Sequence, residues 1–165
     1  MKLIIILLSF LPLTMWAQKD EIFAKFVNED GSVIKGSSVT KNYERQIPFY
    51  SLESNSAGKS TIVRFTMPIE SASGVLRNVQ LSQGRIRSAE IAVTYISLDR
   101  RFVRYKINME NIEVEECADS GGTTVVQLHA SRIGWTYYSY TKSGIQSVNS
   151  KNGWDEEQGI PWSNF

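Results

Sequence analysis

The sequence has very little of two residue types that commonly bind metals in proteins. Cys117 is its only cysteine and His129 its only histidine, among 165 residues. One cysteine cannot form an intramolecular disulfide, so the hydrophobic core alone must hold the fold together. A metal site needs several nitrogen or sulfur ligands, which this pair cannot supply. We therefore expect no metal and no cofactor.

An excess of charge of either sign is also missing. Lysine and arginine total 18, against 17 aspartates and glutamates. Such a balance gives no basic field that would attract nucleic acid and no acidic field that would attract cations. We expect no nucleic-acid partner, and net charge does not select any other.

The first residues have the layout of a secretory signal peptide. Lys2 precedes an apolar run from Leu3 to Leu13, and the small residue Ala17 stands before a polar stretch. The run is shorter than the roughly 20 residues that span a membrane. We expect cleavage after Ala17, with an uncleaved anchor as the alternative. Residues 1–17 would then be the signal peptide and 18–165 a single exported domain, periplasmic or secreted, with no membrane partner after cleavage.

The longest run of strand-forming residues is Thr123–Tyr140. Apolar side chains alternate with polar ones along it, which is the period of a half-buried strand. The apolar positions change from even to odd numbers near Ser131, and such a one-residue slip predicts a bulge there. The run therefore predicts one long, bent strand across the middle of a β structure.

The rest of the mature chain is also read mainly as strands. Met67–Gln83 is the one plausible helix, with Ser71 or Ser73 as its N-terminal cap and Gly84 as its C-terminal glycine. The small polar residues of Ser54–Ser60 predict a loop. The expected strands are Ile22–Val27, Arg45–Leu52, Thr61–Thr66, Glu90–Ile96, Phe102–Glu110, Ile112–Glu116 and Gln146–Val148. Short turns between consecutive strands favour an antiparallel meander that closes into a small barrel or sandwich.

Several residues resemble catalytic or ligand-binding groups, but the pattern around each favours a simpler interpretation. Gly58-Lys59-Ser60 ends like a phosphate-binding loop, yet a strand follows it where that loop needs a helix. His129 shares a strand face with a glutamine, which predicts a surface or rim position. The acidic neighbours of Cys117 would raise the pKa of its thiol, so we expect an unreactive cysteine in a turn.

The acidic cluster of Glu113, Glu115 and Glu116 could in principle cleave glycosides with a pair of carboxylates. On a strand, however, Glu113 and Glu115 alternate with apolar residues and so lie on the ordinary solvated face. We expect no enzyme activity.

Aromatic residues are abundant towards the C-terminus and leave a binding module open as an alternative. They are Trp135, Tyr137, Tyr138, Tyr140, Trp154 and Trp162. If several were exposed on a monomer, they could bind a carbohydrate or a protein partner. The simpler interpretation places Trp135 and Tyr137 in the core and the other two tyrosines over a subunit contact or the helix.

Several stretches, in this order, resemble the Hcp family, the tube proteins of the bacterial type VI secretion system. They are IFAKFVNEDGSVIKGSSVTKNYERQIPFYSL, FTMPIESASGVLRNVQLSQGRIRSAEIAVTYI, VVQLHASRIGWTYY, NGWD and PW, which together extend from about Ile22 to Trp162. The resemblance implies a small antiparallel β-barrel of two sheets with one flanking α-helix.

The resemblance also implies a structural function. In the family, six copies form a ring, rings stack into a tube, and the lumen can carry effector proteins. It therefore implies a homo-hexameric ring as the first partner, with secretion-apparatus or effector proteins as others. By the same resemblance, the contact with a neighbouring ring would fall on Glu53, Ser54, Asn55, Ser56, Ala57, Gly58, Lys59 and Ser60.

Overall fold

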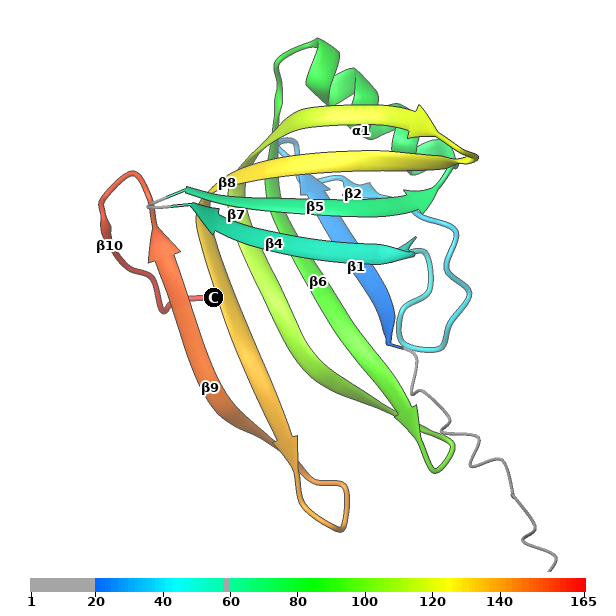
Figure 1. Cartoon of the computed structure of the whole chain (residues 1–165), viewed down its shortest axis with the longest axis vertical. Coiled ribbons are helices and arrows are strands. Elements are labelled where there is room, and N and C mark those ends of the chain that lie inside the picture. Colours follow the sequence, from blue (N-terminus) through cyan, green and yellow to red (C-terminus); the bar gives the residue numbers. More distant parts are fainter. Residues whose placement is uncertain (1–19, 58–59) are drawn as a thin grey trace, which may run out of the picture.

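A computed structural model describes residues 20–57 and 60–165, and they are mainly β (Figure 1). All ten strands belong to one antiparallel network, and α1 (Ser71–Leu81) is the one helix in these residues. The expected mainly β fold with one flanking helix is confirmed. The predicted signal peptide and its cleavage site lie outside the described residues, as do Gly58 and Lys59. Within the described ranges, no helix is long and apolar enough to cross a membrane.

The strands differ greatly in length, and the three longest are consecutive. In chain order they are β1 (Glu21–Asn28), β2 (Val33–Ile34), β3 (Ile47–Phe49), β4 (Ser51–Ala57), β5 (Ser60–Pro68), then after the helix β6 (Arg85–Ser97), β7 (Arg100–Ser120), β8 (Thr123–Tyr140), β9 (Gln146–Asp155) and β10 (Ile160–Pro161).

The strand pairings and one covalent link between β3 and β4 form a closed ring. From β1 the ladder runs through β6 and β7 to β8, and from β8 through β5 to β4. Only Tyr50 separates β4 from β3, which pairs with β1 and so completes the ring. The ring encloses the core, in which Phe49 stacks on Phe65 with ring centroids 3.8 Å apart. This arrangement is the small antiparallel barrel that the sequence predicts.

Strand β8 is long and bent, as expected, but the predicted bulge is in the wrong place. The apolar core positions do change from even to odd numbers, from Ala130 to Ile133, while Gly134 and Thr136 on the opposite face are buried as well. No register shift accompanies this change: β8 exchanges β5 for β9 as its outer neighbour there, and Asn111 on the paired strand takes a left-handed φ of 53°. The register shift between β7 and β8 lies instead at Glu115.

Strand β7 corrects a further expectation. It was predicted as two strands separated at Asn111, but it runs without a break from Arg100 to Ser120. Its pairing with β6 and β8 supplies hydrogen bonds on both sides, so one left-handed residue bends the strand without ending it. The turns at its two ends were predicted correctly.

Helix α1 lies on the C-terminal part of β7 and buries Ala72, Ser73 and Leu76. Its N-terminal cap is Glu70, whose backbone N–H donates to the Ser73 hydroxyl at 3.0 Å. Ser73 therefore takes part in the capping, but from the third helical position. The left-handed residue at the other end is Gln83, with a φ of 53°, and not Gly84.

Candidate assembly surfaces

Within the segment Glu53–Ser60, residues 53–57 and Ser60 belong to the strands of a β-hairpin, although the small polar residues of Ser54–Ser60 predict a loop. Ser51 to Ala57 pair in continuous register with Thr66 to Ser60. Strand β5 is itself paired with β8, so it offers β4 a fixed template that overrides weak local propensity. The contact of this segment with a neighbouring ring stays a prediction, and Gly58 and Lys59 lie outside the described residues.

Beyond Leu52, which packs on the core, residues 53–55 of β4 are open on both faces and along one edge. Glu53, Ser54 and Asn55 are all exposed, although successive side chains of a strand point to opposite faces. In the described part of the chain, β4 pairs with β5 alone, so its outer edge keeps unpaired backbone groups. A two-stranded ribbon of this kind is only marginally stable in water without further cover.

The first half of β9 repeats this arrangement on another part of the molecule. Residues Gln146–Asn149 are exposed on both faces, and β10 pairs only with Trp154 and Asp155 at the far end of the strand. These four residues carry no charge, and β4 carries one. Monomeric proteins commonly protect such edges with lysine or proline, so two unprotected edges indicate surfaces that pair with another chain.

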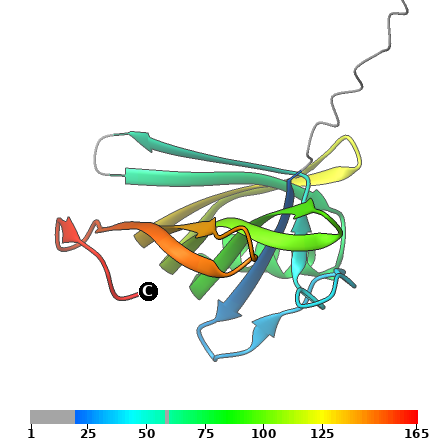
Figure 2. The ribbon, with the colours of Figure 1, turned by 90° about the horizontal axis from the view of Figure 1, so that it is seen from below.

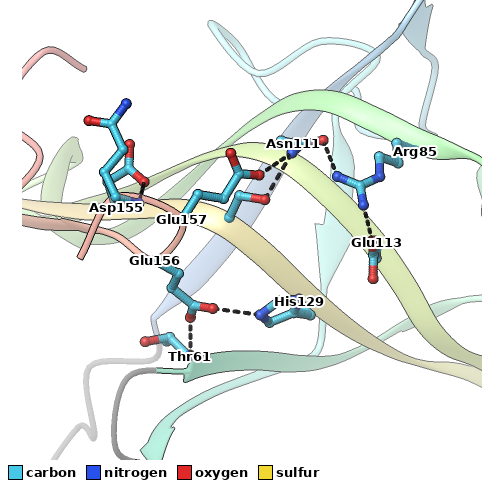
Figure 3. A network of polar contacts seen from close by, with 10 residues as sticks. Thr61, Arg85, Asn111, Glu113, His129, Asp155, Glu156 and Glu157 are labelled. Atoms are coloured by element: carbon cyan, nitrogen blue, oxygen red, sulfur yellow. Dashed lines mark hydrogen bonds and ion pairs between the residues drawn. The ribbon is translucent and has the colours of Figure 1, made fainter. Parts of the chain in front are cut away.

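Near its turn end, the β4–β5 hairpin is tied to β8 and the C-terminal segment by His129 and Glu156 (Figure 3). One Glu156 oxygen lies 2.8 Å from His129 Nε2, and the other accepts a 2.8 Å hydrogen bond from the backbone N–H of Thr61. His129 is therefore half-buried at the rim, where it was expected. Through Glu156, His129 helps to fix the direction in which the hairpin leaves the barrel.

A second group of polar contacts holds the C-terminal segment against the bend of β7 and β8 (Figure 3). The side-chain amide of Asn111 donates to Ser131 Oγ at 2.8 Å and to Glu157 at 2.9 Å. Arg85 donates to the Asn111 oxygen at 2.7 Å. Sequence reasoning missed Asn111, whose only signal was its place between two predicted strands.

Asp155 ends β9 and is nearly inaccessible to solvent. It accepts hydrogen bonds from the backbone N–H of Gln158 at 2.9 Å and from Arg132 Nε at 2.7 Å. These two donors hold the pKa of its carboxyl below the ordinary value, with the Gln158 N–H as the larger cause. Arg132 also reaches Glu110 at 3.2 Å, so these charges stabilise one another.

The three clustered glutamates of β7 each have a partner on another strand: β6 for Glu113, β8 for Glu115 and β5, beyond β8, for Glu116. Glu113 pairs with Arg85, Glu115 accepts from Gln127 at 2.7 Å, and Glu116 lies 3.9 Å from Arg64. The shift at Glu115 also breaks the simple alternation on which their shared face was predicted. Each of these carboxylates is thus paired with a different side chain of the sheet.

Cys117 lies in β7 under the helix, and the prediction of a turn was wrong. Its thiol is buried 3.6 Å from the carbonyl oxygen of Ser73. Burial is the main cause that raises the pKa of the thiol, while the nearby Arg77 acts in the opposite direction. The expected direction of the shift is confirmed, and its main cause is burial.

The C-terminal aromatics mostly pack against the protein itself. Trp135 packs on the core, and the Tyr140 hydroxyl donates to the Val103 carbonyl at 3.0 Å. Tyr137 is the most exposed of the six, at 40%, and was expected in the core; it lies against Tyr105, with ring centroids 5.5 Å apart. The binding-module alternative gains no support from this placement.

The last residue of the chain fills a notch on the outside of the sheet. Gly134 and Gly153 face each other across β8 and β9. The Phe165 ring lies over both glycines, so close that a Cβ on Gly134 would meet ring atoms at 2.3 Å. The predicted strand Gln146–Val148 continues through Gly153 to Asp155, because β8 runs alongside it.

A polar cleft of about 810 Å³ lies on the outer face next to this notch. Its walls include Arg132, Glu110 and Asn111, whose polar groups already bond to one another or to neighbours. Most of its polar side chains thus serve the internal network.

No family model and no curated protein matches the sequence. Comparison with solved structures finds the same fold in several proteins. Hcp1 from Salmonella typhimurium superposes with a TM-score of 0.72 at 20% identity, over 87% of this chain and 99% of that one. A type VI secretion system effector from Yersinia pestis gives 0.63 at 17% identity, over 81% and 98%.

The secreted protein Hcp3 from Pseudomonas aeruginosa gives a TM-score of 0.62 at 16% identity, over 80% of this chain and 98% of that one. In each case nearly the whole of the solved chain is matched. The described domain therefore has the fold of the Hcp proteins along almost its entire length. The resemblance in the sequence predicted this fold correctly.

Proposed function

We propose that this chain is a structural, non-enzymatic subunit that assembles with copies of itself into a ring resembling the tube ring of type VI secretion. Export would follow removal of residues 1–17, leaving residues 18–165 as the assembling domain. Six copies is the number that the family resemblance implies. Secretion-apparatus or effector proteins would then be partners of the assembled ring.

The observation that carries this proposal is the pair of unprotected strand edges on β4 and β9. The two edges belong to different strands with different sequences, so an edge of one copy would meet the other edge of the next. Contacts between unlike surfaces generate rings or filaments, and not two-fold dimers. The match to Hcp structures over nearly their full length supports closure into a ring.

A structural function also agrees with the state of the polar groups. The carboxylates of β7 and the single histidine are bonded to neighbouring side chains or backbone. Their bonds hold the hairpin and the C-terminal segment in position, and a fixed hairpin direction is what a repeated contact between copies requires.

The proposal predicts that lysine on either edge weakens assembly. Ser54→Lys on β4 and Val148→Lys on β9 each place a charge where the next copy would bury it, which is costly. We expect each variant to lower the association constant by about tenfold or more, because tenfold needs only about 1.4 kcal/mol. Light scattering across a concentration series measures this change.

Asn78→Lys is the matched control, because Asn78 is exposed on α1 and lies on neither edge. It adds the same charge and should assemble like the wild type. Circular dichroism confirms that all variants are folded. Edge variants that assemble as well as the control would contradict the proposal.

A further inference from the structure

Two turns at one end of the molecule display apolar side chains to solvent. Leu98, between β6 and β7, is 93% exposed, and Ile145, between β8 and β9, is 66% exposed. Val148, also exposed, follows on β9. Both turns lie at the end opposite α1 (Figure 1). They are neighbours, because a Cβ on Gly144 would come within 3.6 Å of Arg100. We call Leu98 and Ile145 the tip surface; Val148 belongs to the open edge of β9.

The backbone at Leu98 suggests that this display is functional. Leu98 and Asp99 form a two-residue turn with φ values of 49° and 58°. Asn and Gly adopt this conformation most easily, whereas a leucine there costs free energy. An unfavourable residue in a fully exposed turn contributes nothing to the core. Such an outlier is a reason to look for a partner that contacts it.

Basic side chains flank the tip surface. Arg101 and Arg104 are ion-paired with Glu21 and Asp20 at the start of β1. Arg100 and Lys142 are exposed and have no ion pair within the described ranges, and Asp99 is the acidic residue beside them. Apolar tips with free cations behind them match a surface that offers hydrocarbon beneath a layer of negative charge.

The apolar N-terminal segment joins the domain near the same end. Glu21 pairs with Thr94, four residues before Leu98, which is about 13 Å along a strand. The run Leu3–Leu13 ends seven residues before Asp20. In the uncleaved form, which the sequence analysis leaves as the alternative, a membrane that holds this run would lie within reach of the tip surface; after cleavage, docking depends on the tip surface and its flanking cations alone. Figure 2, seen from that end, shows the β4–β5 and β1–β2 hairpins on opposite sides of the molecule, which leaves the two turns towards the viewer.

We propose that the tip surface docks on an anionic phospholipid surface. The Leu98 and Ile145 side chains enter the outer part of the hydrocarbon layer, and Arg100 and Lys142 lie at the lipid phosphates. This function goes beyond ring assembly, and it differs from the expectation that no membrane partner remains after cleavage. Docking at this end leaves the β4 edge free for another copy.

The test is flotation with vesicles of phosphatidylcholine mixed with phosphatidylglycerol, beside vesicles of phosphatidylcholine alone. All proteins come from one exporting host, and mass spectrometry establishes that they share one N-terminus. We expect the double variant Leu98→Asn/Ile145→Asn to lower binding to the mixed vesicles by about tenfold or more, since each side chain loses its apolar contact. Arg100→Gln/Lys142→Gln should lower the preference for the mixed vesicles.

Two features keep the test decisive. Asn tolerates a positive φ, so Leu98→Asn should melt no lower than the wild type while it binds lipid less. Leu81→Asn, at the C-terminus of α1 and 75% exposed, is the matched control and should bind like the wild type. The proposal would be overturned if the wild-type protein bound neither vesicle type, or if the double variant bound the mixed vesicles as well as the wild type does.

Ring assembly is measured on the same proteins by light scattering without vesicles. A double variant that loses self-association, together with a wild type that does not bind lipid, would make the tip surface a contact between copies and the lipid proposal wrong. A wild type that binds lipid but stays monomeric would support docking and count against ring assembly alone.

Discussion

At the scale of single residues, the tightest constraint lies under the last side chain. Because a Cβ on Gly134 would overlap the Phe165 ring, Gly134→Ala must displace that ring. We expect a loss of about 1–3 kcal/mol in the free energy of unfolding, typical of overpacking. Urea denaturation followed by tryptophan fluorescence measures it, since Trp162 packs against Phe165.

A second background separates the clash with Phe165 from any general effect of alanine at position 134. In a Phe165→Ala background the clash is absent, so Gly134→Ala should cost far less there. Gly74→Ala in α1 meets no atom within 4 Å and should raise stability by about 0.5–1 kcal/mol. Equal costs in both backgrounds would show that Phe165 is not the cause.

At the scale of elements, the left-handed position that caps the C-terminus of α1 is occupied by Gln83, although glycine adopts this conformation more easily. The Gly84 N–H donates to the Val79 carbonyl and the Gln83 N–H to the Gln80 carbonyl, which is the Schellman pattern. In that pattern the left-handed position belongs to Gln83 and not to the glycine after it. Gln83→Gly should therefore stabilise the protein by about 1 kcal/mol, seen as a higher melting temperature.

Asn78→Gly provides the comparison for this prediction. Asn78 lies inside the helix, where glycine has a lower propensity than asparagine, so this change should lower the melting temperature. If both glycine variants shifted it in the same direction, the left-handed conformation of Gln83 would not be the cause.

The elements that the sequence predicted well are those with their own periodicity. β8, the core of the helix and the two-residue turns around β7 follow from alternation, spacing and turn residues. β4 and the second half of β9 could not be predicted, because their serine, asparagine and glycine residues have little strand propensity. These strands form because they pair with β5 and β8, and this pairing depends on the three-dimensional fold and not on the local sequence.

At the scale of the whole molecule, order and spacing of motifs identified the fold at an identity of 20% or less to the solved Hcp structures described above. The candidate surfaces were harder to predict. The contact segment Glu53–Ser60 was placed by resemblance alone, and its strand conformation came as a correction. The open edge of β9 and the tip surface depend on which strands remain unpaired and which turns come together. Local sequence patterns encode neither the unpaired strand edges nor the proximity of the two turns.

The central claim is that copies of this chain close into a ring. The most direct measurement is the mass of the purified wild-type protein in solution by light scattering, with negative-stain images of the same sample. The account predicts a particle of six subunits that appears as a six-fold ring. A single subunit mass at micromolar concentration, with no rings in the images, would contradict it.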